Sequence, residues 1–387
     1  MNKRNITVGI ITMHRVLNFG SVLQTYALQQ TVGNLGYSSE IIDYKFPNSE
    51  HFMYLEQSDR QPVILPLKSR IIDAIKRRLR ASKPTDEDIR RGKFLKFISD
   101  HLKISKNSYK NRYQIDKNTP LYDVYLTGSD QVWNPSYIGY DTTFMCGFAR
   151  NGNPRISFAA SMAVAEIPEQ FVEYYRTELG KYSSISVREK TTIGLLSKIT
   201  GKTISLVCDP TMLLTKEQWL KQLNVSDSSK YFIVYVLDYT YNPYPQIFEI
   251  IKKCHHQYGG RIIVLNGKID QYMRKNGATV VNTASPVDFI RYFANASFVV
   301  TSSFHGTIFS LNFKVPFISV VDDRIGRDSR VTDLLDLLGA ERFKQIYSEP
   351  VDDNKDLSYT SEISDKIERF RNESLKFLEK ALHNATI

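Results

Sequence analysis

The sequence predicts an α/β protein built from two Rossmann-like domains, and three observations support this class. At 387 residues, the chain is longer than one ordinary domain of about 200 residues or fewer. Its hydrophobic content of 42% and charged content of 24% are close to the averages of folded soluble proteins, so the chain can bury a sizeable core. Finally, strand-like and helix-like segments alternate along the chain in two separate series.

The first series predicts a parallel sheet in the N-terminal half. It opens as a βαβ unit, with a strand over 6–13, a helix over 22–35 and a strand over 39–44. Four more short strands are expected at 123–127, 155–159, 184–187 and 204–207. We expect these strands to form the sheet of an N-terminal Rossmann-like domain over 1–222, with a basic insertion at about 60–115.

The second series follows the polar stretch 224–230 and predicts a C-terminal Rossmann-like domain over 223–350. Its expected strands are 231–237, 261–265, 278–282 and 298–301, and its expected helices are 246–258 and 287–294. The segment 351–387 contains a helical pattern over 361–382, which we expect to pack back on the first domain. Two Rossmann-like domains facing a cleft form the GT-B arrangement, and ligands in such sheets bind beyond the carboxyl ends of the strands.

The cysteines and the apolar runs indicate the cellular compartment and bear on disulfides and zinc sites. The three cysteines are widely spaced and form no C-x-x-C motif, so neither a disulfide framework nor a zinc cluster is expected. The longest apolar runs are far shorter than the roughly 20 residues that cross a bilayer. No cleavage site of a secretory signal follows the basic start of the chain. We therefore expect a cytoplasmic protein.

The net charge of +10 is concentrated in one segment, because 68–96 holds eleven Lys/Arg against four Asp/Glu. Anionic lipid, phosphorylated substrates and nucleic acid are candidate partners for such a patch, and the lack of an RRM, KH, zinc-finger or helix-turn-helix signature argues against nucleic acid. Apolar residues recur every four positions from Leu67 to Leu79, between Lys and Arg residues. This pattern predicts a basic amphipathic helix that either packs on the first domain or binds the anionic inner-leaflet surface of a membrane.

Candidate site residues follow the predicted strands, since the chain lacks the dinucleotide, P-loop, hydrolase and zincin motifs. Asn18, Ser21 and Gln24 lie where the first strand meets its helix, and free N–H groups at a helix start suit an anion or a sugar hydroxyl. The alternative is an ordinary capped turn. In the stretch GSDQVWN, Asp130 could accept a proton from a sugar hydroxyl, while Trp133 and Asn134 could contact the sugar. The alternative is a turn aspartate beside a core tryptophan.

Two further segments carry charge or a titratable group. Arg188 follows a strand, where its guanidinium could hold a carboxylate or phosphate, or could pair with Glu189 or Asp209. His305 lies between hydroxyls and a glycine at a strand end, and histidine is the side chain best suited to acid/base chemistry near neutral pH. The loop after the next strand holds three arginines that would suit a polyanion: Arg324, Arg327 and Arg330.

As a set, these segments resemble the polysaccharide pyruvyl transferase family. The matching stretches stand in the family's order over nearly the whole chain: NFGSVLQTYAL, GSDQVWN, ISFAAS, SVREK, CDPTMLL, TSSFHGTIFSL and the Arg-rich loop before TDLLDLLG. The resemblance implies a GT-B-like fold, phosphoenolpyruvate as donor, and a sugar acceptor, such as a lipid-linked galactose, that receives a pyruvate ketal. It implies no metal and no dissociable cofactor.

The resemblance also assigns roles. Arg188 matches the arginine that holds the donor, His305 the proposed acid/base, and Asp130 an acidic position facing the cleft. Many members carry an arginine two residues before the histidine, where this chain has Ser303. We expect Ser303 to contact the donor, and Arg324, Arg327 or Arg330 to supply the missing charge. We also expect the N-terminal domain to form the acceptor side of the cleft and the C-terminal domain the donor side. A nucleotide-sugar glycosyltransferase of the GT-B fold and a non-catalytic sugar-binding protein are the alternative functions.

Overall fold

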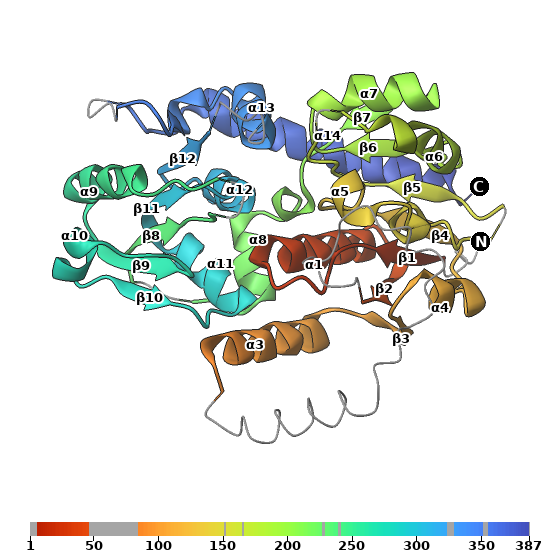
Figure 1. The fold of residues 1–387 in the computed structure, drawn as a ribbon, viewed down its shortest axis with the longest axis horizontal. Coiled ribbons are helices and arrows are strands. Elements are labelled where there is room, and N and C mark those ends of the chain that lie inside the picture. Colours follow the sequence, from red (N-terminus) through yellow and green to blue (C-terminus); the bar gives the residue numbers. More distant parts are fainter. Residues whose placement is uncertain are drawn as a thin grey trace.

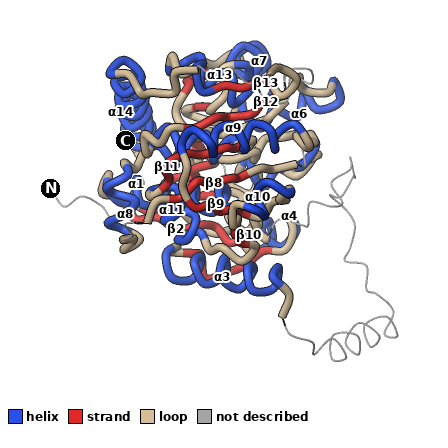
Figure 2. Tube along the Cα trace, turned by 90° about the vertical axis from the view of Figure 1, so that its left-hand side faces the viewer, coloured by secondary structure: helices blue, strands red, loops and turns tan. Residues whose placement is uncertain are grey.

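The computed structural model describes residues 6–45, 84–150, 152–164, 166–226, 229–238, 241–322, 329–350 and 355–386. Two parallel sheets lie side by side, each flanked by helices (Figure 1). In the perpendicular view of Figure 2, the helices surround the strands. The predicted class of a GT-B-like α/β protein with two Rossmann-like units is confirmed.

The N-terminal sheet has five parallel strands in the order β3-β2-β1-β4-β5. Its strands are β1 (Thr7–Ile11), β2 (Ser38–Tyr44), β3 (Ile104–Tyr109), β4 (Val124–Thr127) and β5 (Arg155–Ser157). The helices of this half are α1 (Phe19–Asn34), α3 (Asp86–His101), α4 (Arg112–Lys117), α5 (Pro135–Ile138), α6 (Glu169–Leu179), α7 (Thr191–Thr200) and α8 (Lys216–Gln222). The strand order reverses between β1 and β4, which is where sheets of this type bind ligands.

The C-terminal sheet has six parallel strands in the order β10-β9-β8-β11-β12-β13. Its strands are β8 (Tyr231–Tyr235), β9 (Arg261–Leu265), β10 (Thr279–Val281), β11 (Ala296–Thr301), β12 (Phe317–Val321) and β13 (Lys344–Ile346). The helices are α9 (Gln246–Tyr258), α10 (Gln271–Lys275), α11 (Pro286–Ala294), α12 (Phe304–Asn312), α13 (Ser329–Leu338) and α14 (Ser361–Asn384). Its order reverses between β8 and β11, so α12 starts at the second reversal point.

The segments 184–187 and 204–207 were expected in the N-terminal sheet, and this expectation is wrong. Instead, β6 (Ile185–Val187) and β7 (Ile204–Leu206) form a separate two-stranded sheet. Only isolated bridges among the described residues connect β6 to the β5 region. The strand β5 ends at Ser157, and two residues later Ala159 has a φ of 53°. That left-handed conformation cannot continue a strand. The bend brings the end of β6 toward the carboxyl end of β4.

The two halves share one hydrophobic core. Phe19 of α1 stacks on Phe289 of α11 with ring centroids 4.7 Å apart, so the contact between the halves is aromatic. Helix α14 adds a second connection, because the backbone N–H of Cys208 donates to Ser374 Oγ over 2.8 Å and the Phe377 ring lies beside Phe158. Figure 1 shows α14 running from beside α13 to β5 and β6.

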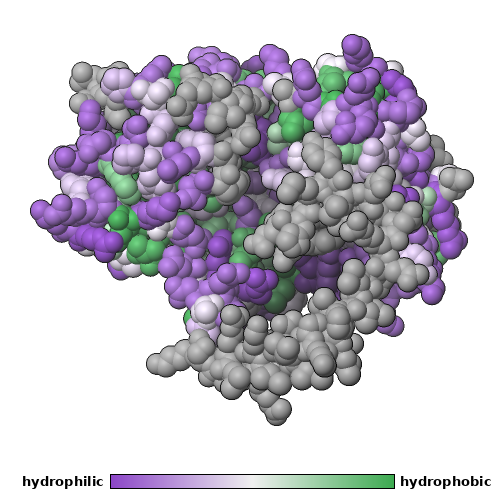
Figure 3. Space-filling model, in the orientation of Figure 1, coloured by the Kyte–Doolittle hydropathy of each residue, from purple (hydrophilic) through white to green (hydrophobic). Residues whose placement is uncertain are grey.

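Two predictions fall outside the described residues. One is the basic amphipathic helix from Leu67 to Leu79, and the other is the donor-binding role of Arg324 and Arg327. The face seen in Figure 3 is largely hydrophilic, with small separate hydrophobic areas. Among the described helices, none combines the length and the apolar composition needed to cross a bilayer.

Candidate active site

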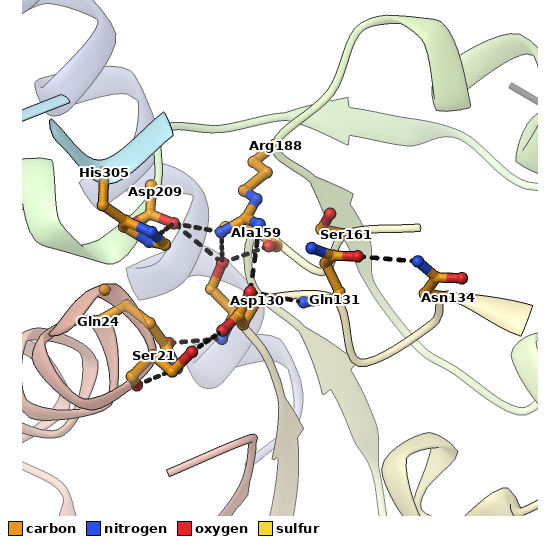
Figure 4. A network of polar contacts seen from close by, with 12 residues as sticks. Ser21, Gln24, Asp130, Gln131, Asn134, Ala159, Ser161, Arg188, Asp209 and His305 are labelled. Carbon is orange, nitrogen blue, oxygen red and sulfur yellow. Dashed lines mark hydrogen bonds and ion pairs between the residues drawn. The ribbon is translucent and has the colours of Figure 1, made fainter. Parts of the chain in front are cut away.

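A cluster of charged and hydroxyl side chains lies where the carboxyl ends of both large sheets and of β6–β7 come together (Figure 4). Each member follows a different strand, so residues far apart in the sequence meet at one place. The members are Ser21, Asp130, Arg188, Asp209 and His305. All five are buried.

Arg188 is the centre of this cluster, with 1% of its side chain exposed. Its Nη1 donates to Asp209 Oδ2 over 2.7 Å, and its Nη2 donates to Asp130 Oδ1 over 3.4 Å. Glu189 Oε1 lies 3.8 Å from Nε. Burial alone would lower the pKa of Arg188, but these three carboxylates outweigh it and raise the pKa. The ion-pair alternative considered for Arg188 is therefore present in the structure.

Asp209 was expected only as a possible ion-pair partner of Arg188, and its place beside His305 was not predicted. Its Oδ1 accepts from the backbone N–H and the hydroxyl of Thr211, over 3.0 and 2.8 Å, and this fixes the carboxylate at the start of a short 3₁₀ helix. Its Oδ2 therefore points at Arg188 and at His305 Nε2, which is 3.6 Å away. Burial would raise the pKa of Asp209, but His305 and Arg188 hold it well below its usual range.

Asp130 lies on the other side of Arg188. It adopts a φ of 70°, which turns its carboxylate toward Ser21 and Arg188, and Ser21 Oγ donates to Oδ2. Burial would raise the pKa of Asp130, yet Arg188 and His305 lower it. The carboxylate is therefore ionised near neutral pH, and it can accept a hydrogen bond from a hydroxyl.

His305 is the second residue of α12 and comes from the C-terminal sheet, whereas its neighbours come from the N-terminal half. Its side chain is 10% exposed. Among the described residues, Nε2 has no hydrogen-bond partner, although Asp209 Oδ2 lies nearby. A buried imidazole beside a fixed carboxylate is an arrangement that recurs in acid/base catalysis, where the carboxylate orients the ring.

A second guanidinium approaches the cluster from α13. The guanidinium carbons of Arg188 and Arg330 lie 4.6 and 5.5 Å from the ring centroid of Phe304, the residue before His305. The Nε atoms of both arginines are buried and lack a hydrogen-bond partner among the described residues. Of the three candidate loop arginines, Arg330 is thus next to the predicted site.

The structure contradicts the prediction that Trp133 stacks on a sugar. Its side chain is fully buried, and its indole N–H donates to the carbonyl of Phe144 over 3.3 Å. The ring packs edge-on against Tyr182. With its faces covered and its polar atom satisfied, Trp133 is a core residue.

Four other predicted binding residues hold the local backbone. Asn18, Asn134 and Ser303 are the N-cap residues of α1, α5 and α12, where each side chain accepts a backbone N–H. Gln24 is fully buried, accepts from Ser129 N over 2.9 Å and donates to Thr12 Oγ1 over 2.8 Å. The side-chain oxygen of each of these residues accepts a hydrogen bond within the protein, so these residues shape the site.

Within the parts of the chain that the structure describes, no group of three or more His, Cys, Asp or Glu side chains is arranged to hold a metal ion.

Fold and site together define a GT-B-like α/β protein with a cluster of buried charged and hydroxyl side chains between its two halves. The model of the family "Polysaccharide pyruvyl transferase" matches residues 18–324, and the chain belongs to this family. This match includes all five members of the cluster. No curated protein matches the sequence.

Three solved structures are similar to the chain, and the first of them, with a TM-score above 0.5, supports the fold. UGT89C1 from Arabidopsis thaliana, complexed with UDP-L-rhamnose, has a TM-score of 0.52 at 11% identity, over 100% of both chains. The UDP-GlcNAc 2-epimerase of Methanocaldococcus jannaschii has a TM-score of 0.45 at 13% identity, covering 95% of this chain and 92% of its own. The E. coli heptosyltransferase WaaC has a TM-score of 0.39 at 14% identity, covering 95% of this chain and 99% of its own. At these identities the likeness concerns the fold alone.

Proposed function

We propose that the chain transfers the pyruvyl group of phosphoenolpyruvate to two hydroxyls of a sugar, with release of phosphate. One observation carries this proposal: His305 of one half lies beside Asp209 and Arg188 of the other, in a chain of the polysaccharide pyruvyl transferase family. Such a cluster combines a group that can transfer a proton with a guanidinium that can bind an anion. Both are required for ketal formation from an enol phosphate.

The donor is held by Arg188 and Arg330 in this proposal. A guanidinium matches the geometry of a carboxylate or phosphate, and both arginines have an Nε without a hydrogen-bond partner among the described residues. Arg330 then supplies the charge that an arginine at position 303 supplies in many family members. Arg324 and Arg327 belong to the same loop of the sequence and are the other candidates for this role.

Reaction begins with transfer of a proton from His305 to the methylene carbon of the donor. This leaves oxocarbenium character on the central carbon, and Asp209 stabilises the imidazolium before the transfer. One sugar hydroxyl adds to that carbon while Asp130 accepts its proton. The second hydroxyl then displaces phosphate, which leaves with the remaining proton, and the ketal is closed. Fixed cations stabilise the departing phosphate without reorganisation.

The acceptor is proposed to be a hexose of a cell-surface polysaccharide, with a galactose on a polyprenyl diphosphate as one candidate. The basic segment 68–96 supports this, because its excess of seven positive charges could bind a diphosphate or the anionic inner leaflet. The protein would then work in the cytoplasm, at the membrane surface.

The test is to incubate the full chain with phosphoenolpyruvate and a panel of soluble and lipid-linked galactosides. Mass spectrometry should reveal an acceptor that gains pyruvate with loss of one water. A parallel panel of nucleotide sugars separates the alternatives. Release of nucleotide with glycosyl transfer would establish a glycosyltransferase instead, and donor binding without turnover on any acceptor would favour a sugar-binding protein.

A further inference from the structure

Gly20 lies in the first turn of α1, opposite the imidazole of His305. A Cβ built on Gly20 would lie 1.9 Å from Nδ1, 2.2 Å from Cγ and 2.4 Å from Cε1 of that ring. Real Cβ atoms essentially never approach heavy atoms so closely. The contact joins a helix of the N-terminal half to the side chain that the C-terminal half brings to the cluster.

The glycine is not needed for its backbone conformation. Gly20 is helical and is not among the glycines with a positive φ, so an alanine could adopt the same backbone. In a helix interior, alanine is normally the more favourable residue. The space that Gly20 leaves is therefore the reason for a glycine at this position.

The ring has little room to avoid a side chain at position 20. Asp209 lies on its Nε2 side, and the ring of Phe304 lies 5.4 Å away between centroids. The clash involves Cγ, the atom that attaches the ring to its Cβ, so a movement of the ring tip alone cannot relieve it. A methyl group on Gly20 would have to turn the whole imidazole or move α12 away from α1.

We propose that Gly20 is a positioning residue. Because it has no side chain, the first turn of α1 can lie against the imidazole of His305 and hold the ring beside Asp209. The proposal rests on the proposed function, in which His305 transfers the proton. The helix turn at Gly20 then forms one wall of the site, and Asp209 forms another. The two walls come from the N-terminal half, so the imidazole is aligned only when both halves are together.

The test compares Gly20→Ala with Gly33→Ala. Gly33 lies in the last turn of the same helix, and a Cβ there meets nothing within 4 Å, so it is a matched control for the change of residue type. We expect Gly20→Ala to lower kcat by about 100-fold, as for misplacement of a catalytic group by about 1 Å, with a smaller change in KM. Gly33→Ala should retain full kcat. Equal kcat for Gly20→Ala and wild type would overturn the proposal.

A double-mutant cycle with His305→Ala separates the role of Gly20 from the reaction itself. His305→Ala removes the three atoms that lie nearest to a Cβ at position 20. Gly20→Ala should therefore lower the urea midpoint in the wild-type background and leave it unchanged in the His305→Ala background. The imidazole signal of His305 in ¹⁵N–¹H NMR should also move in Gly20→Ala and stay in place in Gly33→Ala. These two readouts need no turnover, so they remain informative if the proposed reaction is wrong. The same loss of stability in both backgrounds, or an unmoved imidazole signal, would contradict the proposal.

Discussion

Changing Asp209 to Asn tests the charge balance of the cluster. Asparagine has the same shape and can still accept from Thr211 through Oδ1, but its Nδ2 would face the Nη1 of Arg188, now 2.7 Å from a carboxylate oxygen. Arg188 would keep only the longer contacts to Asp130 and Glu189, at 3.4 and 3.8 Å, and would lose its one short hydrogen bond to a carboxylate. We expect the free energy of unfolding to fall by about 3 kcal/mol, the lower end of the cost of breaking a buried ion pair.

Urea denaturation followed by circular dichroism measures this change, and the exposed pair of Lys268 and Asp238 provides the control. Asp238→Asn should change the free energy of unfolding by less than about 1 kcal/mol. The folded-state pKa of Asp209 is lowered, so its stabilisation is complete above the ordinary value of 3.8 and is lost as the pH falls toward the folded value. The gap between wild type and Asp209→Asn should therefore be full at neutral pH and shrink below about pH 4. An equal urea midpoint for both proteins, or a gap independent of pH, would refute this reasoning.

Three further outcomes are expected. Asp130→Asn should lower turnover by at least about 100-fold, because the carboxylate of Asp130 accepts the proton of the sugar hydroxyl. Donor binding should not weaken, since this carboxylate repels an anionic donor. Weaker binding of phosphoenolpyruvate in calorimetry would argue against this role. Arg330→Gln should weaken the binding free energy of phosphoenolpyruvate by roughly 1.5–3 kcal/mol, as for a charge-assisted hydrogen bond. Arg342→Gln, which alters a pair with exposed Asp356, should leave this binding free energy unchanged. The protein should co-sediment with anionic but not neutral liposomes at low salt. Changing Arg77, Arg78 and Arg80 together to Glu should abolish this co-sedimentation, while activity on a soluble acceptor persists. Equal sedimentation of the triple variant and wild type would remove the membrane proposal.

Much of the fold was predictable from local patterns, because buried parallel strands are continuous apolar runs and surface helices have a clear periodicity. The predicted helix over 246–258 and strand over 261–265 coincide with α9 and β9. The strand β3 was not predicted, since its sequence ISKNSY contains one apolar residue before its final tyrosine and has three exposed positions. The separation of β6 and β7 from the main sheet depends on the backbone at Ala159, and nothing in an alanine indicates a positive φ.

The sequence indicated which residues follow strands and therefore meet at the site, but it did not indicate which of their side chains contact one another. The positions of Asp130, Arg188 and His305 at the carboxyl ends of strands were enough to bring them together. Asp209 belongs to the motif CDPTMLL, and its place after a short strand was the available signal for its role. Trp133 was misassigned because an aromatic residue beside polar neighbours has the same local sequence whether its ring is buried or exposed. Burial depends on Tyr182 and Phe144, which are distant in the sequence or on another element.

The most direct measurement of the central claim is phosphate release from phosphoenolpyruvate by wild type and His305→Ala, with and without a galactoside acceptor. The account predicts that wild type releases phosphate only when the acceptor is present, in equal amount to the pyruvylated product. His305→Ala should bind the donor with nearly unchanged affinity and release phosphate about 10² to 10⁴ times more slowly. Wild-type turnover in His305→Ala, or phosphate release by wild type that does not depend on the acceptor, would contradict the account.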